Sequence, residues 1–179
     1  MFHKGRLHAD PPHLTADDQP IEFKKSVKFL GLIFDRRMNF REHVESLRTR
    51  CTKAMNVLKS VSHLSWGGDR GSILKLYRSL IRSKLDYGSQ FYGSTTNTIL
   101  KRLDTVHNTA MRLALGAFKS SPVLSLCAES GEVPLRYRRT QLALQHYVRL
   151  QRIHESPAAS CVLDDSRDRL YEGLSLIHI

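Results

Sequence analysis

Several features that define other protein classes are missing from this sequence. No apolar run is long enough to cross a bilayer, and the opening stretch MFHKGRLHADPPHL is polar and broken by proline where a secretory signal needs an apolar segment. Cys51, Cys127 and Cys161 are too few and too far apart to support a disulfide framework or a CxxC metal knuckle. We therefore expect a reduced, intracellular protein, in the nucleus or the cytoplasm, with no membrane partner and no structural zinc.

Motifs of hydrolytic and nucleotide-binding enzymes are missing as well. The sequence has no Gly-rich phosphate loop and no Ser/His/Asp arrangement, and its nine histidines are scattered without HxxxH or HxxE spacing. His43 and His107 are accordingly interpreted as packing or capping residues and not as ligands.

Positive charge is what the sequence has in excess. It contains 28 Lys and Arg against 17 Asp and Glu, a formal net charge of +11, in a chain of 179 residues that is 41% apolar. This length suits one ordinary domain or two very small ones. The excess favours polyanionic partners, nucleic acid above all, because phosphate contacts release counterions.

The N-terminal part carries the strand pattern. In residues 19–35, QPIEFKKSVKFLGLIFD, Ile21 and Phe23 alternate with polar residues, and VKFLGLIF is a short β-rich apolar run. The preceding ADDQP has turn chemistry. These patterns predict an antiparallel hairpin or small sheet across about residues 12–35.

The apolar period becomes helical from Asn39, where Asn39 and Glu42 form a capping-box-like pair. SWGGDRGS ends the first helix, and Asp69 suits the next N-cap. The apolar stripe of the first helix comprises Val44, Leu47, Cys51, Met55, Leu58 and Val61. The second helix has an apolar face of Ile73, Leu76, Tyr77, Leu80 and Ile81 and an outer face of Lys75, Arg78, Arg82 and Lys84.

A third helix is predicted over about residues 98–117, and two more follow. Ser121 starts a short helix with Pro122 at its first position, and a long helix covers about residues 134–154. Residues 155–179 have no periodicity and are predicted to be a linker or disordered. The predicted fold is mainly α: an N-terminal antiparallel β-hairpin, then a three-helix bundle, then a further long helix.

An ordered set of short motifs runs from about residue 25 to residue 140. It comprises VKFLGLIFD, LYRSLIRSKLDYG, LDTVHNTAMRLALGA and SPVLSLCAESGEVPL. Each motif is weak alone. In this order and spacing they resemble the region downstream of the catalytic palm in reverse transcriptases of non-LTR (LINE) retrotransposons, the Jockey-like elements of arthropods especially.

The resemblance implies a division of the chain. Residues 1–38 would be the palm edge, with a primer-grip hairpin at 27–35 that holds the 3′ end of the growing strand. Residues 39–117 would be the helical thumb that clamps the duplex, and residues 118–154 the start of the connection. The implied partners are an RNA/DNA template–primer duplex and the remainder of the polymerase, its fingers and palm.

The resemblance also raises the question of Asp17 and Asp18. Polymerases of this family carry catalytic carboxylates in an aromatic-Ala-Asp-Asp hairpin, dozens of residues before the KFLG strand. Here TADD ends about ten residues before VKFLG, and Thr15 stands where the aromatic residue belongs. We interpret the pair as a turn. The parent enzyme would use Mg²⁺ and deoxynucleotides, whereas this chain, read as a fragment with a non-native tail at 174–179, is expected to hold no cofactor and to be inactive alone.

The basic residues are the candidate nucleic-acid contacts, alongside the hairpin residues Phe29, Leu30 and Gly31. Five cations flank the proposed primer grip and three follow the second helix at a spacing that could track phosphates. A solvated helix face is the alternative for each of them, and the rival function is a stand-alone helical module that binds nucleic acid or protein. The cations are Lys24, Lys25, Lys28, Arg36, Arg37, Arg78, Arg82 and Lys84.

Overall fold

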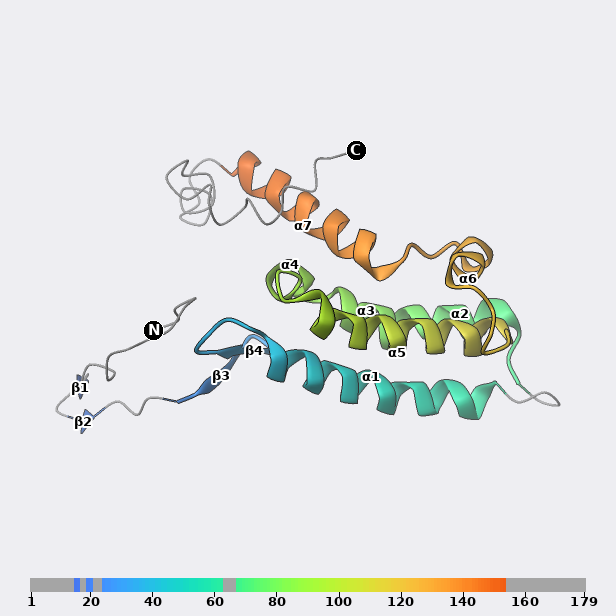
Figure 1. The fold of residues 1–179 in the computed structure, drawn as a ribbon, viewed down its shortest axis with the longest axis horizontal. Coiled ribbons are helices and arrows are strands. Elements are labelled where there is room, and N and C mark those ends of the chain that lie inside the picture. Colours follow the sequence, from blue (N-terminus) through green and yellow to red (C-terminus); the bar gives the residue numbers. More distant parts are fainter. Residues whose placement is uncertain (1–14, 17–18, 21–23, 63–66, 154–179) are drawn as a thin grey trace.

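A computed structural model describes residues 15–16, 19–20, 24–62 and 67–153 (Figure 1). The predictions made for Asp17 and Asp18, for Ile21 and Phe23, and for residues 155–179 lie outside the described residues. Within the described part the fold is mainly α with an N-terminal antiparallel hairpin, as the sequence predicts.

The described strands form two separate antiparallel pairs. β1 (Thr15–Ala16) pairs with β2 (Gln19–Pro20), and β3 (Ser26–Phe29) pairs with β4 (Leu32–Asp35). The apolar run VKFLGLIF is therefore two strands joined by a turn.

The β3–β4 turn consists of two residues, Leu30 and Gly31, because Phe29 lies opposite Leu32 in the register. Both have positive φ, 45° at Leu30 and 81° at Gly31, which is the type I′ geometry that matches the twist of a tight hairpin. Glycine adopts this geometry freely, whereas leucine does so at a cost in conformational energy.

Residues 41–61 form the first helix, α1 (Arg41–Val61), and residues 70–86 form one continuous rod. The rod consists of α2 (Arg70–Tyr77), a π-helical segment η1 (Arg78–Arg82) and α3 (Ser83–Asp86). The remaining helices are α4 (Ser89–Tyr92), α5 (Asn97–Leu115), α6 (Val123–Ser130) and α7 (Leu135–Arg152). None of the helices in the described part of the chain is both long and apolar enough to span a membrane.

The start of α1 differs from the predicted capping box. The Asp35 carboxylate accepts the backbone N–H of Asn39 at 3.1 Å and of Phe40 at 2.7 Å, while the Phe40 N-cap position has no side-chain cap. The Asn39–Glu42 pairing was therefore wrong. Positive φ at Met38 and Phe40 turns the chain back, so that the acid at the end of β4 reaches the N–H groups first.

The other helix starts are closer to prediction. Asp69 caps α2 as expected, because its carboxylate accepts the Ser72 N–H at 3.1 Å. Pro122 occupies the N-cap of α6 and not its first helical position, so that prediction was wrong by one residue.

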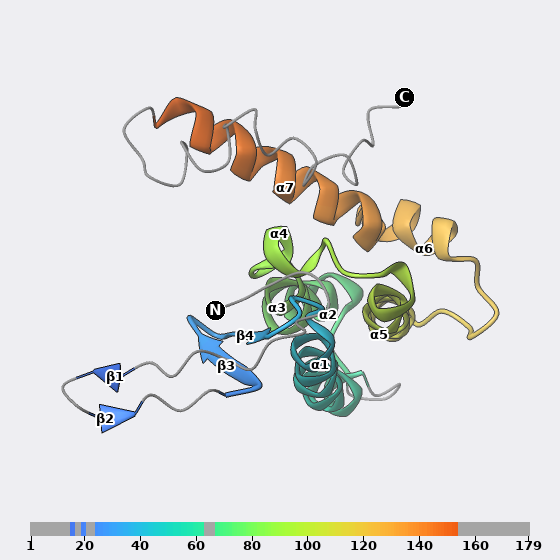
Figure 2. The same ribbon diagram turned by 60° about the vertical axis from the view of Figure 1, so that its left-hand side comes forward.

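The core lies where α1, the 70–86 rod and α5 pack together, seen nearly end-on in Figure 2. α7 crosses the bundle beside α4, and α6 packs on α5. β4 lies on the first turns of α1 and buries Leu32. The largest fully buried apolar side chains are Tyr77, Tyr92, Leu47, Leu58, Ile81, Leu85, Leu103, Met111 and Leu126.

Candidate nucleic-acid interface

The β3–β4 hairpin projects its tip and its cations into solvent. Phe29 is 62% and Leu30 73% exposed, while Gly31 is half-buried. Five basic side chains, exposed in every case, flank this tip, and none of them forms an ion pair with an acidic residue in the described ranges: Lys24, Lys25, Lys28, Arg36 and Arg37.

The hairpin is fastened to the end of α3 by its turn. The Tyr87 hydroxyl donates to the Leu30 carbonyl at 2.6 Å, and the Tyr87 ring lies beside Gly31. Leu32 packs so closely on Gly88 that a Cβ at position 88 would lie 2.6 Å from a Leu32 methyl group. The tip therefore has a defined place on the bundle.

Three aromatic residues follow α3. Tyr92 is core: it is buried, and its hydroxyl donates to the Leu85 carbonyl. Tyr87 is 59% exposed but its hydroxyl is engaged, and Phe91 is exposed beside the ring of His146.

An open pocket of about 310 Å³ lies beside the fastened turn, between α1 and the end of α3. Lys84 was predicted as a contact, and the structure places it here. Arg50, two helical turns after His43 on α1, was missed although its spacing of seven residues puts both on one helix face. The residues that line the pocket are His43, Arg50, Ser83, Lys84 and Tyr87.

The charge of this pocket comes from Arg50 and Lys84. Burial first, and then the nearby Arg50 charge, lower the pKa of His43 to about 4, so its imidazole is neutral at pH 7. Its Nδ1 accepts the Ile33 N–H at 3.3 Å, which leaves the proton on Nε2. Burial likewise raises the pKa of the Cys51 thiol to about 11, against the influence of both cations.

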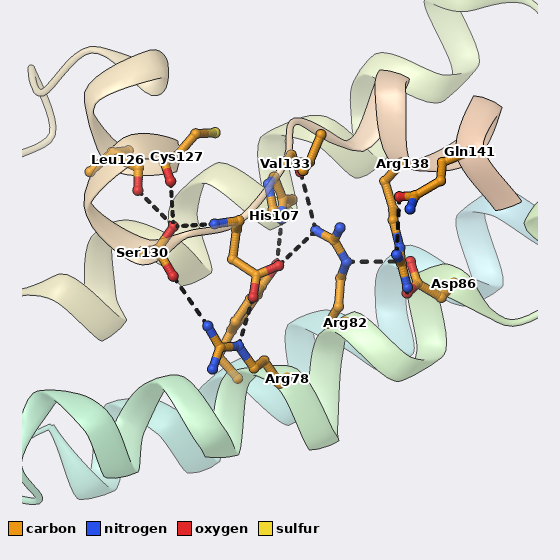
Figure 3. Close-up of polar contacts among 12 residues, drawn as sticks. Arg78, Arg82, Asp86, His107, Leu126, Cys127, Ser130, Val133, Arg138 and Gln141 are labelled. Carbon is orange, nitrogen blue, oxygen red and sulfur yellow. Dashed lines mark hydrogen bonds and ion pairs between the residues drawn. The ribbon is translucent and has the colours of Figure 1, made fainter.

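Arg82 does not lie on the outer face where the sequence analysis put it. Its side chain is 9% exposed, with Nε 3.3 Å from Asp86 and Nη1 3.3 Å from Glu132 (Figure 3). Arg78 Nε pairs with the same Glu132 at 2.7 Å, and Arg138 pairs with Asp86 at 2.9 Å. The α6–α7 segment covers this side of the rod, so Arg82 faces carboxylates and not solvent.

No family model matches the chain, and no solved structure does. It is 30% identical over 110 residues to the probable RNA-directed DNA polymerase from transposon X-element of Drosophila melanogaster, which covers 59% of this chain. It is 34% identical over 93 residues, 51% of this chain, to a Pol polyprotein from the type-1 retrotransposable element R1 of Bradysia coprophila. The RNA-directed DNA polymerase from mobile element jockey of Drosophila funebris is 30% identical over 112 residues, 60% of this chain.

The chain is similar to polymerase and Pol sequences of non-LTR retrotransposons. Its matched segments span 12%, 9% and 12% of the lengths of these three curated relatives. The resemblance that the motif order predicts is thereby confirmed.

The motif D-Y-G, which helped to indicate these polymerases, has a clear structural role in this chain. Asp86 binds Arg82 and Arg138, Tyr87 binds the hairpin turn, and Gly88 makes room for Leu32. Three consecutive residues thus connect the rod to α7 on one side and to the hairpin on the other.

Proposed function

We propose that this chain contributes template–primer duplex binding to the RNA-directed DNA polymerase of a non-LTR retrotransposon. The observation that carries the proposal is the cluster of exposed cations on the hairpin and its flanks, without carboxylate partners among the described residues. Two of the relatives are RNA-directed DNA polymerases, whose nucleic-acid substrate would be a suitable ligand for such a surface.

The hairpin supplies two kinds of contact to a nucleic-acid strand. Lys28 lies in β3, with Lys24 and Lys25 just before it, and Arg36 and Arg37 follow β4. These cations contact phosphates and so position the duplex without reading its sequence. The exposed Phe29 and Leu30 at the tip offer an apolar surface to a sugar or a base. Together they suit a hairpin that holds a strand end, with α1, the rod and α5 as the thumb behind it.

The outer face of α7 is the surface we assign to the second partner, the remainder of the polymerase. Leu144, Tyr147 and Val148 are 55%, 38% and 44% exposed along one side of that helix. Contiguous exposed apolar side chains mark protein contacts.

Catalysis by the parent enzyme would need Mg²⁺ held by clustered carboxylates. The described residues do not fit that ion, since they contain no group of three or more His, Cys, Asp or Glu side chains able to hold a metal. We derive no catalytic step through it and propose that this chain binds duplex without extending a primer. Primer extension by the purified chain with Mg²⁺ and all four deoxynucleotides would contradict that part of the proposal.

A fluorescence titration with RNA–DNA hybrid at several salt concentrations tests the binding role. We expect log K to fall with log salt by about 0.9 for each phosphate contacted, and the triple change Lys24→Gln, Lys25→Gln, Lys28→Gln to make that slope shallower by about two or more. Arg48→Gln is the matched control, because Arg48 is exposed but paired with Glu45. Absent or salt-indifferent binding would overturn the proposal in favour of a stand-alone helical module that binds protein.

A further inference from the structure

The pocket between α1 and the end of α3 combines two cations with a buried hydrogen-bond donor. Arg50 and Lys84 come from two different elements, 34 positions apart in the sequence, and line the same opening. Neither pairs with an acidic residue in the part of the chain that the structure describes. Two like charges converge here without a counterion from the protein.

His43 lines the same pocket and has one ring nitrogen without a partner. The residue is 1% exposed, its Nδ1 is taken by the Ile33 N–H, and Nε2 finds no hydrogen-bond partner among the described residues. Buried polar groups in proteins nearly always have a partner, so an orphan N–H next to two cations calls for an acceptor. Arg50 and Lys84 lack an anion and His43 Nε2–H lacks an acceptor, and an anionic oxygen has the chemistry that each of the three groups needs.

We propose that this pocket holds one phosphate group of a nucleic-acid strand, with Arg50 and Lys84 binding its anionic oxygens and His43 Nε2–H donating to one of them. The inference rests on the proposed function and deepens it by naming where on the surface a phosphate is anchored. It adds Arg50 and His43 to the residues that sequence reasoning found.

The surroundings favour a phosphate within a chain over a small free ligand. The pocket is open, and about 310 Å³ is at the lower end of the range for sites that enclose a whole ligand. Tyr87 lines it and also holds the hairpin turn at Leu30. A strand lying on the hairpin tip would therefore pass this opening with its backbone.

The affinity test compares Arg50→Gln with Lys53→Gln in the full chain. Both remove one α1 cation that has no ion-pair partner among the described residues, but only Arg50 lines the pocket. For Arg50→Gln we expect about tenfold weaker hybrid binding at moderate salt and a salt slope shallower by about 0.9. Lys53→Gln should lose less than threefold.

A second measurement follows the His43 Nε2–H proton by NMR, assigned by its disappearance in His43→Gln, while hybrid or inorganic phosphate is added. A shift with hybrid in wild type, absent in Arg50→Gln, supports a backbone phosphate in the pocket. A shift with inorganic phosphate but not with hybrid would assign the pocket to free phosphate and overturn the backbone part of the inference.

The outcomes separate this inference from the proposed function. If hybrid binding is steeply salt-dependent but Arg50→Gln behaves like Lys53→Gln and the His43 signal does not move, the pocket proposal fails and the duplex role stands. If hybrid does not bind at all while inorganic phosphate shifts His43, the duplex role fails and the pocket is a phosphate site of another kind. If neither ligand has any effect, both fail.

Discussion

Arginine and lysine are used in opposite ways on the two sides of the α2–η1–α3 rod. On the side that faces α6 and α7, Arg82 lies between Asp86 and Glu132, while Arg78 pairs with Glu132 and Arg138 with Asp86. On the side that faces α1 and the hairpin, Arg50, Lys84 and the five cations beside the hairpin have no carboxylate partner among the described residues. The hairpin flanks and the pocket between α1 and α3 therefore keep unpaired cations available to an external anion.

This difference teaches that charge spacing along a helix does not reveal the role of a cation. A buried arginine between carboxylates contributes to stability mainly because its removal leaves those buried negative charges with one cationic partner fewer. An unpaired surface cation contributes little to folding and is free to bind a phosphate. Stability and affinity should consequently respond to different residues.

The largest expected effect is that of Arg82→Met. Removal of Arg82 leaves Asp86 paired only with Arg138 and Glu132 only with Arg78. We expect a loss of about 3 kcal/mol in the free energy of unfolding, measured by urea denaturation. Arg50→Met is the matched change on the unpaired side and should stay within about 0.5 kcal/mol of wild type. Equal losses for the two variants would show that the paired Arg82 contributes no more to stability than the unpaired Arg50.

Acid should destabilise both sides through their buried histidines. Burial, followed by the Arg82 and Arg139 charges, lowers the pKa of His107 to about 3, and His43 lies at about 4. Below the unfolded value of 6.5 the unfolded chain binds protons that the folded chain does not, so the free energy of unfolding falls as the pH decreases from 6.5 to about 4. We expect a loss on the order of 2 kcal/mol.

Urea titrations between pH 7.5 and 4.5 measure this effect. His107→Gln and His43→Gln should each remove part of the pH dependence, with the larger part lost in His107→Gln. A free energy of unfolding that is flat over this range would show that neither imidazole is buried as the structure has it.

Gly88→Ala tests the contact between the hairpin and the segment that follows α3. Gly88 has φ of 69°, and an added methyl group would meet the Leu32 side chain at 2.6 Å. We expect a loss of about 1.5 kcal/mol in stability from the left-handed backbone and the contact together. Hybrid affinity should fall as well, because the hairpin is displaced; Gly116→Ala, with a similar φ and open space around it, isolates the backbone part of the cost.

The smallest expected effect is a gain in stability. Leu30 is 73% exposed and has φ of 45°, a conformation that asparagine adopts more readily. Leu30→Asn should therefore raise the free energy of unfolding by about 0.5 kcal/mol while weakening hybrid binding a few-fold. A variant that is more stable and binds equally well would show that the apolar tip has no part in binding.

Local patterns were enough to predict the helices and their apolar faces. Val44, Leu47 and Leu58 are buried as the stripe of the first helix requires, and Asp69 caps the second because it needs only the next turn of chain. The hairpin was predicted from residues with high β-propensity. Of the two turn residues only Gly31 favours a turn, since Leu30 has no turn preference.

Features that depend on distant residues could not be predicted in this way. Arg82 is neutralised by Glu132, fifty positions later, and Arg50 meets Lys84 only after two helices have packed. Asp35 replaces Asn39 as the acceptor at the start of α1 because the chain doubles back between them. Each of these is a consequence of tertiary packing, which helical spacing does not encode.

The π-helical segment Arg78–Arg82 can also be described as one inserted residue in an otherwise regular rod. One residue of an α-helix corresponds to about 100° of rotation. Everything after the segment is therefore turned by that angle relative to α2, including Asp86, Tyr87 and Gly88.

Deleting a single residue there would leave the composition nearly intact and restore an unbroken α-helix. It would also swing the hairpin attachment and the α7 attachment away from their partners together. One extra residue in the rod thus sets the orientation of the hairpin and of α7 at the same time.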